Sequence, residues 1–172
     1  FPIMFYIGGK ITKKIRMEKA ELKIDYMVYE ESYPEGYEDL CRAALKITEN
    51  AYCAYSGFAV GAAVLMDTGE IVCGSNQENI AYPSGLCAER TALFYATSTY
   101  PGTGIKALAI AARDHGVEVD EYVTPCGACR QVMAEVIRRY GADFDVIMMG
   151  KKQTVVIKAS QLLPFSFDSL KK

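Results

Sequence analysis

Residues 58–75 read FAVGAAVLMDTGEIVCGS and consist of two short apolar runs on either side of a polar turn. The turn contains Asp67, Thr68 and Gly69, a combination typical of a tight connection between strands. We therefore predict an antiparallel hairpin from Phe58 to Ser75. The segments that flank this hairpin determine which kind of sheet contains it.

Helical periodicity flanks the hairpin on both sides. Before it, four apolar residues recur at spacings of four, three and four positions: Leu40, Ala44, Ile47 and Ala51. This spacing predicts one face of an amphipathic helix that ends near Tyr55. After the hairpin, a polar loop leads to CAERTALFYAT, residues 87–97, which is rich in helix formers and predicts a second helix.

The rest of the chain supplies a third helix and three more strands. The apolar run IKALAIAA, residues 105–112, fits a buried central strand. Helix start and stop signals enclose the periodic run in TPCGACRQVMAEVIRRYGA, residues 124–142. DVIMMG and TVVIK, residues 145–150 and 154–158, add two strands. This order predicts a three-layer α/β/α fold, with a mixed sheet of about five strands flanked by helices.

The composition fits one compact domain. The chain has 172 residues, of which 51% are hydrophobic, and a formal net charge of −2. Positive and negative side chains are mixed, so the sequence has no basic stripe that would bind a phosphate backbone or an anionic membrane. We therefore expect neither long nucleic acid nor a membrane as a partner.

The first 35 residues precede these predicted elements. FPIMFYIGG, residues 1–9, is too short to span a bilayer, and the basic residues follow it, whereas a signal peptide places them first. We expect no targeting signal and a cytoplasmic location. AELKIDYMVYEE, residues 20–31, is a candidate strand. We interpret residues 1–35 as an N-terminal extension that is either partly artificial, with Met17 as the natural start, or an extra strand.

The six cysteines fall into two groups. Three lie in segments predicted as a helix and strands, where a free cysteine is usually a small buried hydrophobe: Cys41, Cys53 and Cys73. The other three lie where a turn meets a helix: Cys87, Cys126 and Cys129. Their positions favour thiols that bind metal or act in catalysis over a disulfide framework.

Cys126 and Cys129 are three residues apart at the start of a helix, where the helix dipole favours thiolates. Alone, this pair fits a thioredoxin-like redox pair, half of a structural zinc site, or two ligands of a catalytic zinc. Cys87 brings the number of thiolates to three, and catalytic zinc keeps its fourth position for water. His115, the only histidine, lies in a polar loop and is expected in solvent rather than at the metal.

Two charged residues follow Cys87 directly. A carboxylate such as Glu89, beside a metal that carries water, can take a proton from that water and deliver it to a substrate. Its alternative role is to complement the helix dipole as a first-turn acid. Zinc with three thiolates has a net charge of −1, and Arg90 can offset it by donating hydrogen bonds to the sulfurs. The alternative for Arg90 is an ordinary surface arginine.

Two motifs together carry a specific resemblance. NQENIAYPSGLCAERTA, residues 76–92, followed by TPCGACRQVMAE, residues 124–135, closely resembles the homotetrameric, small-subunit, three-cysteine zinc cytidine deaminases. The resemblance extends from about Tyr37 to LLPFSF, residues 162–167. It implies a cytidine deaminase-like catalytic domain over residues 36–172.

The resemblance also implies roles for individual residues. Cys87, Cys126 and Cys129 would hold one Zn²⁺ per subunit, and Glu89 would carry protons during hydrolysis at C4 of the pyrimidine. Four further groups would contact the nucleoside: Asn76 and Glu78 at the ribose 3′-hydroxyl, Phe58 at the base, and the Ala88 backbone N–H at O2. Tyr82 and Phe167 would reach the site of a neighbouring subunit. On its own, NQEN also fits an ordinary Asx-rich turn.

The function implied is deamination of free cytidine and 2′-deoxycytidine in pyrimidine salvage. The alternatives are a sister deaminase acting on a nucleoside antibiotic or another amino-heterocycle, a thiol-disulfide oxidoreductase, and a non-enzymatic zinc-binding module. Two features depart from the family. CAYS, residues 53–56, stands where many relatives have C-P-Y-S, and the N-terminal extension has no clear counterpart.

Overall fold

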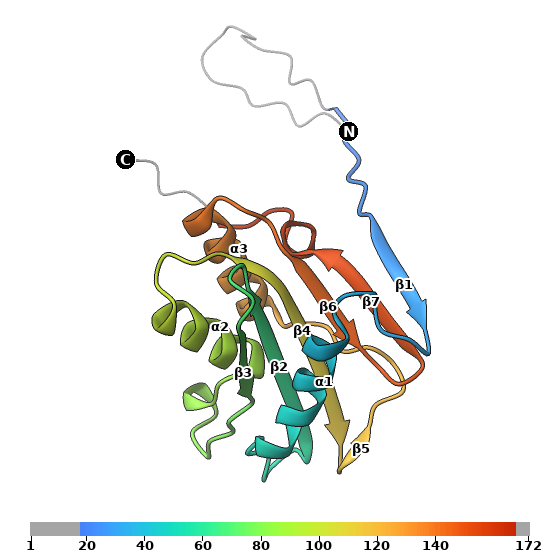
Figure 1. Ribbon diagram of the computed structural model, residues 1–172, viewed down its shortest axis with the longest axis vertical. Helices are drawn as coiled ribbons and strands as arrows, with labels where there is room; N and C mark the ends of the chain where they lie inside the picture. Colours follow the sequence, from blue (N-terminus) through green and yellow to red (C-terminus); the bar gives the residue numbers. More distant parts are fainter. Residues whose placement is uncertain (1–17, 168–172) are drawn as a thin grey trace, which may run out of the picture.

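The computed structural model describes residues 18–167 (Figure 1). Its strands are β1 Tyr26–Glu30, β2 Phe58–Met66, β3 Ile71–Ser75, β4 Ile105–Asp114, β5 Val117–Glu118, β6 Asp145–Met149 and β7 Gln153–Lys158. Its α-helices are α1 Glu38–Ile47, α2 Ala88–Thr99 and α3 Gly127–Tyr140. Short 3-10 turns occur at Thr48–Asn50, Tyr82–Ser84 and Ala159–Leu162.

The strands form one mixed sheet in the order β1-β7-β6-β4-β2-β3, with β5 paired to the end of β4. Within the described part of the chain, β4 and β6 are the parallel pair, and the other neighbours are antiparallel. The predicted hairpin is present as β2 and β3, and the run beginning at Ile105 is the central strand β4. The predicted mixed sheet and α/β class are thus confirmed.

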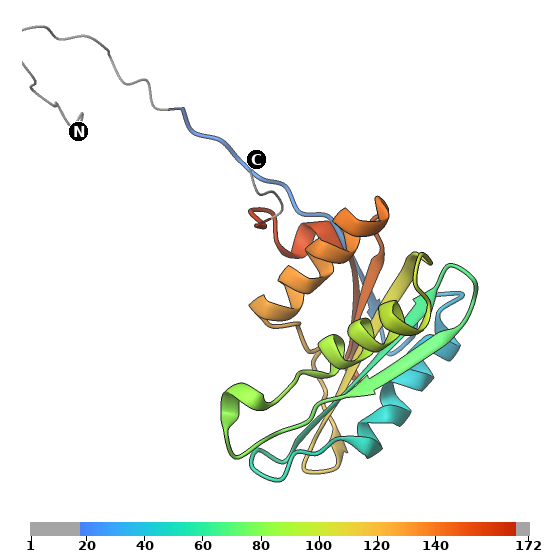
Figure 2. The ribbon, with the colours of Figure 1, turned by 90° about the vertical axis from the view of Figure 1, so that its left-hand side faces the viewer.

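Helices cover both faces of the sheet, which gives three layers (Figure 2). Successive residues of β4 alternate between the faces, so Ala107 and Ala109 pack with α1, while Leu108 and Ile110 pack with α2 and α3. Gly74 of β3 lets α2 approach closely, because a Cβ at this position would lie 2.5 Å from the backbone nitrogen of Ala92. The sheet therefore fixes where α2 begins.

The first helix is shorter than predicted. α1 ends at Ile47, and a single 3-10 turn follows, so the segment around Tyr55 is a turn rather than helix. The Thr48 hydroxyl donates to the Leu45 carbonyl over 2.7 Å, a local bond of the kind that competes with helix continuation. Cys53 consequently lies in the turn and is partly exposed, whereas Cys41 is buried in α1 as predicted.

The sheet also has more strands than the five predicted, since seven are present in residues 18–167. The additions are β5, which has two residues, and β1, which lies within the candidate strand segment 20–31 and pairs with β7. The division at residue 35 stays a prediction, and the proposed start at Met17 lies outside the described residues. None of the helices in the described part is both long and apolar enough to span a membrane.

Candidate metal centre and active site

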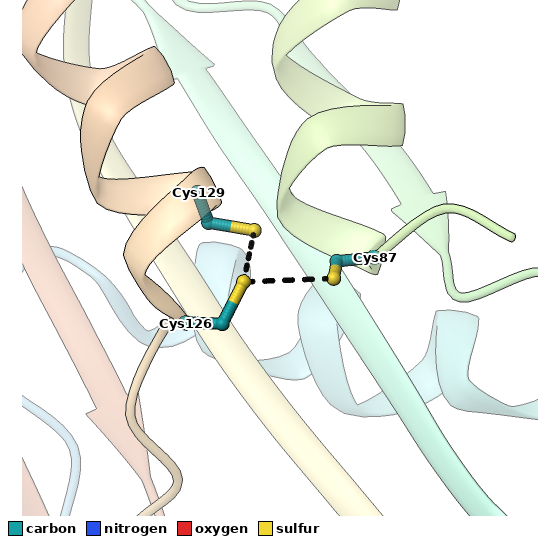
Figure 3. Close-up of side chains that lie close together, drawn as sticks. All are labelled: Cys87, Cys126 and Cys129. Atoms are coloured by element: carbon teal, nitrogen blue, oxygen red, sulfur yellow. Dashed lines mark hydrogen bonds between the residues drawn. The ribbon is translucent and has the colours of Figure 1, made fainter. Parts of the chain in front are cut away.

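Three cysteine sulfurs meet where two helices begin (Figure 3). Cys87 directly precedes α2, Cys126 directly precedes α3, and Cys129 lies in the first turn of α3. The Cys126 sulfur lies 3.8 Å from that of Cys87 and 3.5 Å from that of Cys129, and all three lie within 4.8 Å of one another. Tetrahedral zinc with Zn–S bonds of about 2.3 Å places its sulfurs about 3.8 Å apart, so the cluster fits zinc.

The surroundings shift the pKa values of two of these thiols in opposite directions. Burial raises the pKa of Cys126, but hydrogen bonds from the backbone N–H of Cys129, from the thiols of Cys129 and Cys87, and from the backbone N–H of Ala128 together lower it below its ordinary value. Burial and the nearby Glu89 carboxylate raise the pKa of Cys129. A coordinated metal ion deprotonates such thiols. The cluster thus offers three sulfur ligands to a metal ion, and His115 lies outside it in an exposed turn, as expected.

Glu89 lies beside the sulfurs and is only 5% exposed. Burial raises the pKa of its carboxyl, although hydrogen bonds with its own backbone and with the Cys129 thiol oppose the change. An acid that only complemented a helix dipole would gain nothing from such burial. The burial therefore disfavours a role limited to the helix dipole, and the structure places a buried carboxyl group beside the cluster.

Arg90 turns toward the same sulfurs. Its Nη2 donates a hydrogen bond to the Cys87 sulfur over 3.5 Å, and its Nε is buried without a hydrogen-bond partner among the residues described. The guanidinium, like the two helix N-termini, brings positive charge to a cluster with an excess of negative charge. The alternative of an ordinary surface arginine does not fit this position.

Asn76 and Glu78 organise the loop that leads into β2. The Asn76 side chain accepts from the Val60 N–H over 2.7 Å and donates to the Phe58 carbonyl over 3.0 Å. The Glu78 carboxylate accepts from the backbone N–H groups of Tyr55 and Ser56 over 2.8 and 3.3 Å. Hydrogen bonds from Ser56 and Tyr55 lower the pKa of Glu78. Both side chains therefore bind backbone groups of residues 55–60, a different segment of the chain. The side chain of a simple Asx-type turn would bond only to backbone next to it in sequence.

The remaining predicted site residues occupy different settings. Phe58 is partly exposed at the start of β2, and Ala88 is buried as the first residue of α2, where backbone N–H groups have no intrahelical partner. Tyr82 and Phe167 are 77% and 69% exposed in this single chain.

Sequence reasoning missed the residues that hold these two aromatic residues. The rings of Tyr55 and Tyr82 pack edge to face, with their centroids 6.3 Å apart. The Gln131 side-chain amide donates to the Phe167 carbonyl over 2.7 Å and accepts from its N–H over 3.3 Å. Neither contact has a sequence signal, because the partners are 27 and 36 positions apart and belong to different segments.

Comparisons with known proteins agree with this site. Residues 34–140 match the family model of the cytidine and deoxycytidylate deaminase zinc-binding region. A cytidine deaminase of Halalkalibacterium halodurans is 41% identical over 130 residues, which cover 76% of this chain and 92% of that protein. The resemblance to zinc cytidine deaminases inferred from the two sequence motifs is thereby confirmed.

Solved structures give the same result. The cytidine deaminase from Burkholderia pseudomallei has a TM-score of 0.64 and 38% sequence identity, covering 76% of this chain and 98% of that one. The cytidine deaminase from Mycobacterium tuberculosis has a TM-score of 0.62 and 34% identity, covering 80% of this chain and 100% of that one. This chain belongs to the cytidine and deoxycytidylate deaminase zinc-binding family.

Proposed function

We propose that this protein hydrolyses the amino group from C4 of cytidine and 2′-deoxycytidine, giving uridine, 2′-deoxyuridine and ammonia for pyrimidine salvage. The observation that carries the proposal is the meeting of three thiols and a buried carboxyl at two helix N-termini. Relatives that match 76% of the chain, including the protein from Halalkalibacterium halodurans, are cytidine deaminases by name.

Cys87, Cys126 and Cys129 would hold the zinc ion. When bound, zinc supplies a Lewis acid that lowers the pKa of a coordinated water. The three cysteines leave one tetrahedral position for that water, since no fourth protein ligand lies in the cluster among residues 18–167. Arg90 reduces the surplus negative charge of the thiolates through its bond to Cys87 and thereby helps to keep the water acidic.

Glu89 would move the protons. It receives one from the water and delivers it to N3 of the pyrimidine, and it then assists departure of the amino group as ammonia. A raised pKa suits this work, because a carboxyl must be able both to accept and to release the proton near neutral pH.

The nucleoside would lie between the cysteine cluster and residues 55–60, which form the turn before β2 and the start of that strand. Asn76 and Glu78 are expected to bind the ribose 3′-hydroxyl, Phe58 to pack on the base, and the Ala88 N–H to meet O2. Because Asn76 and Glu78 already hold backbone groups, their side chains are fixed before the substrate arrives. Free cytosine should react poorly, because it lacks the sugar hydroxyl that these two side chains would bind.

We also propose that the protein is a homotetramer in which Tyr82 and Phe167 complete a neighbour's site. The strong exposure of these two aromatic side chains supports this arrangement. Ile80 and Phe165, two positions before each of them in the sequence, are also 82% and 93% exposed. A cytoplasmic location is supported by the six cysteines, none of which forms a disulfide with another.

The direct test is ammonia release from cytidine, 2′-deoxycytidine and cytosine, with zinc content measured on the same sample. The proposal predicts close to one zinc per chain, turnover of both nucleosides and little turnover of cytosine. A zinc-loaded protein that releases no ammonia from either nucleoside would contradict it. If the protein instead reduced a test disulfide, and this activity required Cys126 but not zinc, the result would support the oxidoreductase alternative.

A further inference from the structure

The turn between β4 and β5 reaches back to the loop that precedes β2. His115 and Gly116 form its centre, and both have positive φ, 48° and 84°, the pattern of a type I′ hairpin turn. The backbone N–H of His115 donates to the carbonyl of Gly57 over 2.9 Å. The turn is therefore bonded to the residue directly before Phe58.

The imidazole ring of His115 also lies against Gly57. A Cβ built on Gly57 would be 2.6 Å from Nε2 of the ring and within 2.9 Å of two of its carbons. Gly57 has a φ of +70°, and its own N–H donates to the Cys53 carbonyl over 2.9 Å. A side chain at position 57 would thus meet the ring and strain the backbone, so the contact requires glycine.

The ring itself is held by its neighbour. Nδ1 of His115 lies 2.7 Å from Oδ1 of Asp114, and Asp114 is the ladder partner of Phe58. The start of β2 is consequently held from both edges, by the β4–β5 turn on one side and by the bond from Asn76 to the Phe58 carbonyl on the other.

We propose that His115 is a positioning residue that holds Gly57 and thereby sets where Phe58 meets the base. The proposal rests on the deaminase function proposed above. Type I′ turns favour Asn-Gly at their centre, so an asparagine would serve the turn well. What the histidine adds is a ring long enough to reach Gly57. Because Phe58 would contact the base before and during the reaction, its displacement weakens binding and raises KM more than it lowers kcat.

The informative variant is His115→Asn in the full chain. Asparagine tolerates positive φ and suits the turn, so this change removes the ring while keeping the hairpin. We expect KM for cytidine to rise about three- to tenfold, with kcat within about twofold of wild type and no fall in Tm. Val117→Thr, at an exposed position of the same hairpin, is the matched control and should leave all three unchanged.

A double-mutant cycle isolates the contact. Gly57→Ala should raise KM in the wild-type background, through both the clash with the ring and the strained φ. It should raise KM less in the His115→Asn background, where the ring is gone. Equal effects in both backgrounds would overturn the proposal, as would a wild-type KM for His115→Asn. If His115→Asn instead lowered both Tm and kcat but left KM unchanged, the role of His115 would be merely structural. This result would also overturn the proposal.

Hydrogen exchange provides a readout without activity. In His115→Asn the amides of residues 57–60 should exchange several-fold faster than in wild type, and in Val117→Thr they should not. If wild-type protein did not deaminate cytidine, the proposed function would have failed, and the exchange result alone would decide whether His115 holds this segment. Unchanged exchange at residues 57–60 would show that it does not.

Discussion

Arg90 lies in the first turn of α2, three residues after Cys87, and its guanidinium donates to the Cys87 sulfur over 3.5 Å. Removing this donor should leave the thiolate charge uncompensated. We predict that Arg90→Ala weakens zinc binding or kcat/KM by about 10- to 100-fold. Competition with a chelator and steady-state kinetics measure the two effects.

Arg138→Ala is the control, because Arg138 is an exposed arginine near the end of α3. It should retain wild-type zinc affinity and rate. Arg90→Lys should fall between Ala and wild type, since lysine keeps the charge but not the planar fork of donors. Wild-type behaviour of Arg90→Ala would exclude the charge-compensating role.

Removing the metal should expose particular thiols. After chelation we expect Cys87 and Cys126 to react with an alkylating agent, while Cys41 and Cys129 stay protected because both are fully buried. Peptide mapping by mass spectrometry identifies the modified residues. Zinc added before the reagent should protect Cys87 and Cys126, and equal labelling of these two cysteines with and without zinc would contradict the metal assignment.

Glu78 should discriminate between a nucleoside and its base. Glu78→Gln keeps the shape of the side chain but loses the charge that accepts hydrogen bonds from Tyr55 and Ser56. We predict a fall in kcat/KM for cytidine of about 10- to 100-fold and a much smaller change for cytosine, which has no sugar. Equal losses for both compounds would show that Glu78 acts on the loop alone.

Tyr37 should make stability depend on alkaline pH. Burial, followed by the hydrogen bond from its hydroxyl to Oδ2 of Asp145 over 2.9 Å, raises the pKa of Tyr37 to about 12. A raised pKa contributes stability that is fully present below the unfolded value near 10 and is lost as pH rises through about 12.

Tyr37→Phe tests this directly, because it removes the hydroxyl and little else. At pH 8 we expect a loss of about 1 kcal/mol in the free energy of unfolding. The difference between the two proteins should narrow from pH 10 to pH 12 in denaturant titrations. A difference that stays constant over this range would contradict the pKa assignment.

Sequence patterns specified the elements with strong local signals. The hairpin around Asp67, the buried strand from Ile105 and the third helix with its closing Gly141 were all predictable, because turn residues and apolar periodicity act locally. The extent of α1 was not, since the apolar spacing continues to Ala51 while the Thr48 side chain interrupts the helix. β1 is an edge strand with mostly exposed residues, so its alternation is weak.

The site also contains some features that the sequence could predict and others that it could not. The spacing of the three cysteines and their positions at helix starts predicted that they act together. The topology of the sheet then brings the two helix starts, and with them the three sulfurs, to one place. The bonds from Asn76 to Phe58 and Val60, and the contact of His115 with Gly57, join distant segments and have no local pattern. Such contacts follow from how loops pack at one end of the sheet, which sequence periodicity does not encode.

The central claim is that the buried carboxyl of Glu89 carries protons at a zinc held by three cysteines. The most direct measurement is zinc content together with cytidine turnover in Glu89→Gln, compared with wild type. The glutamine keeps the size of the side chain and should leave close to one zinc per chain, with kcat reduced by at least about 10²-fold. A zinc-loaded Glu89→Gln protein that deaminates cytidine at the wild-type rate would contradict the account.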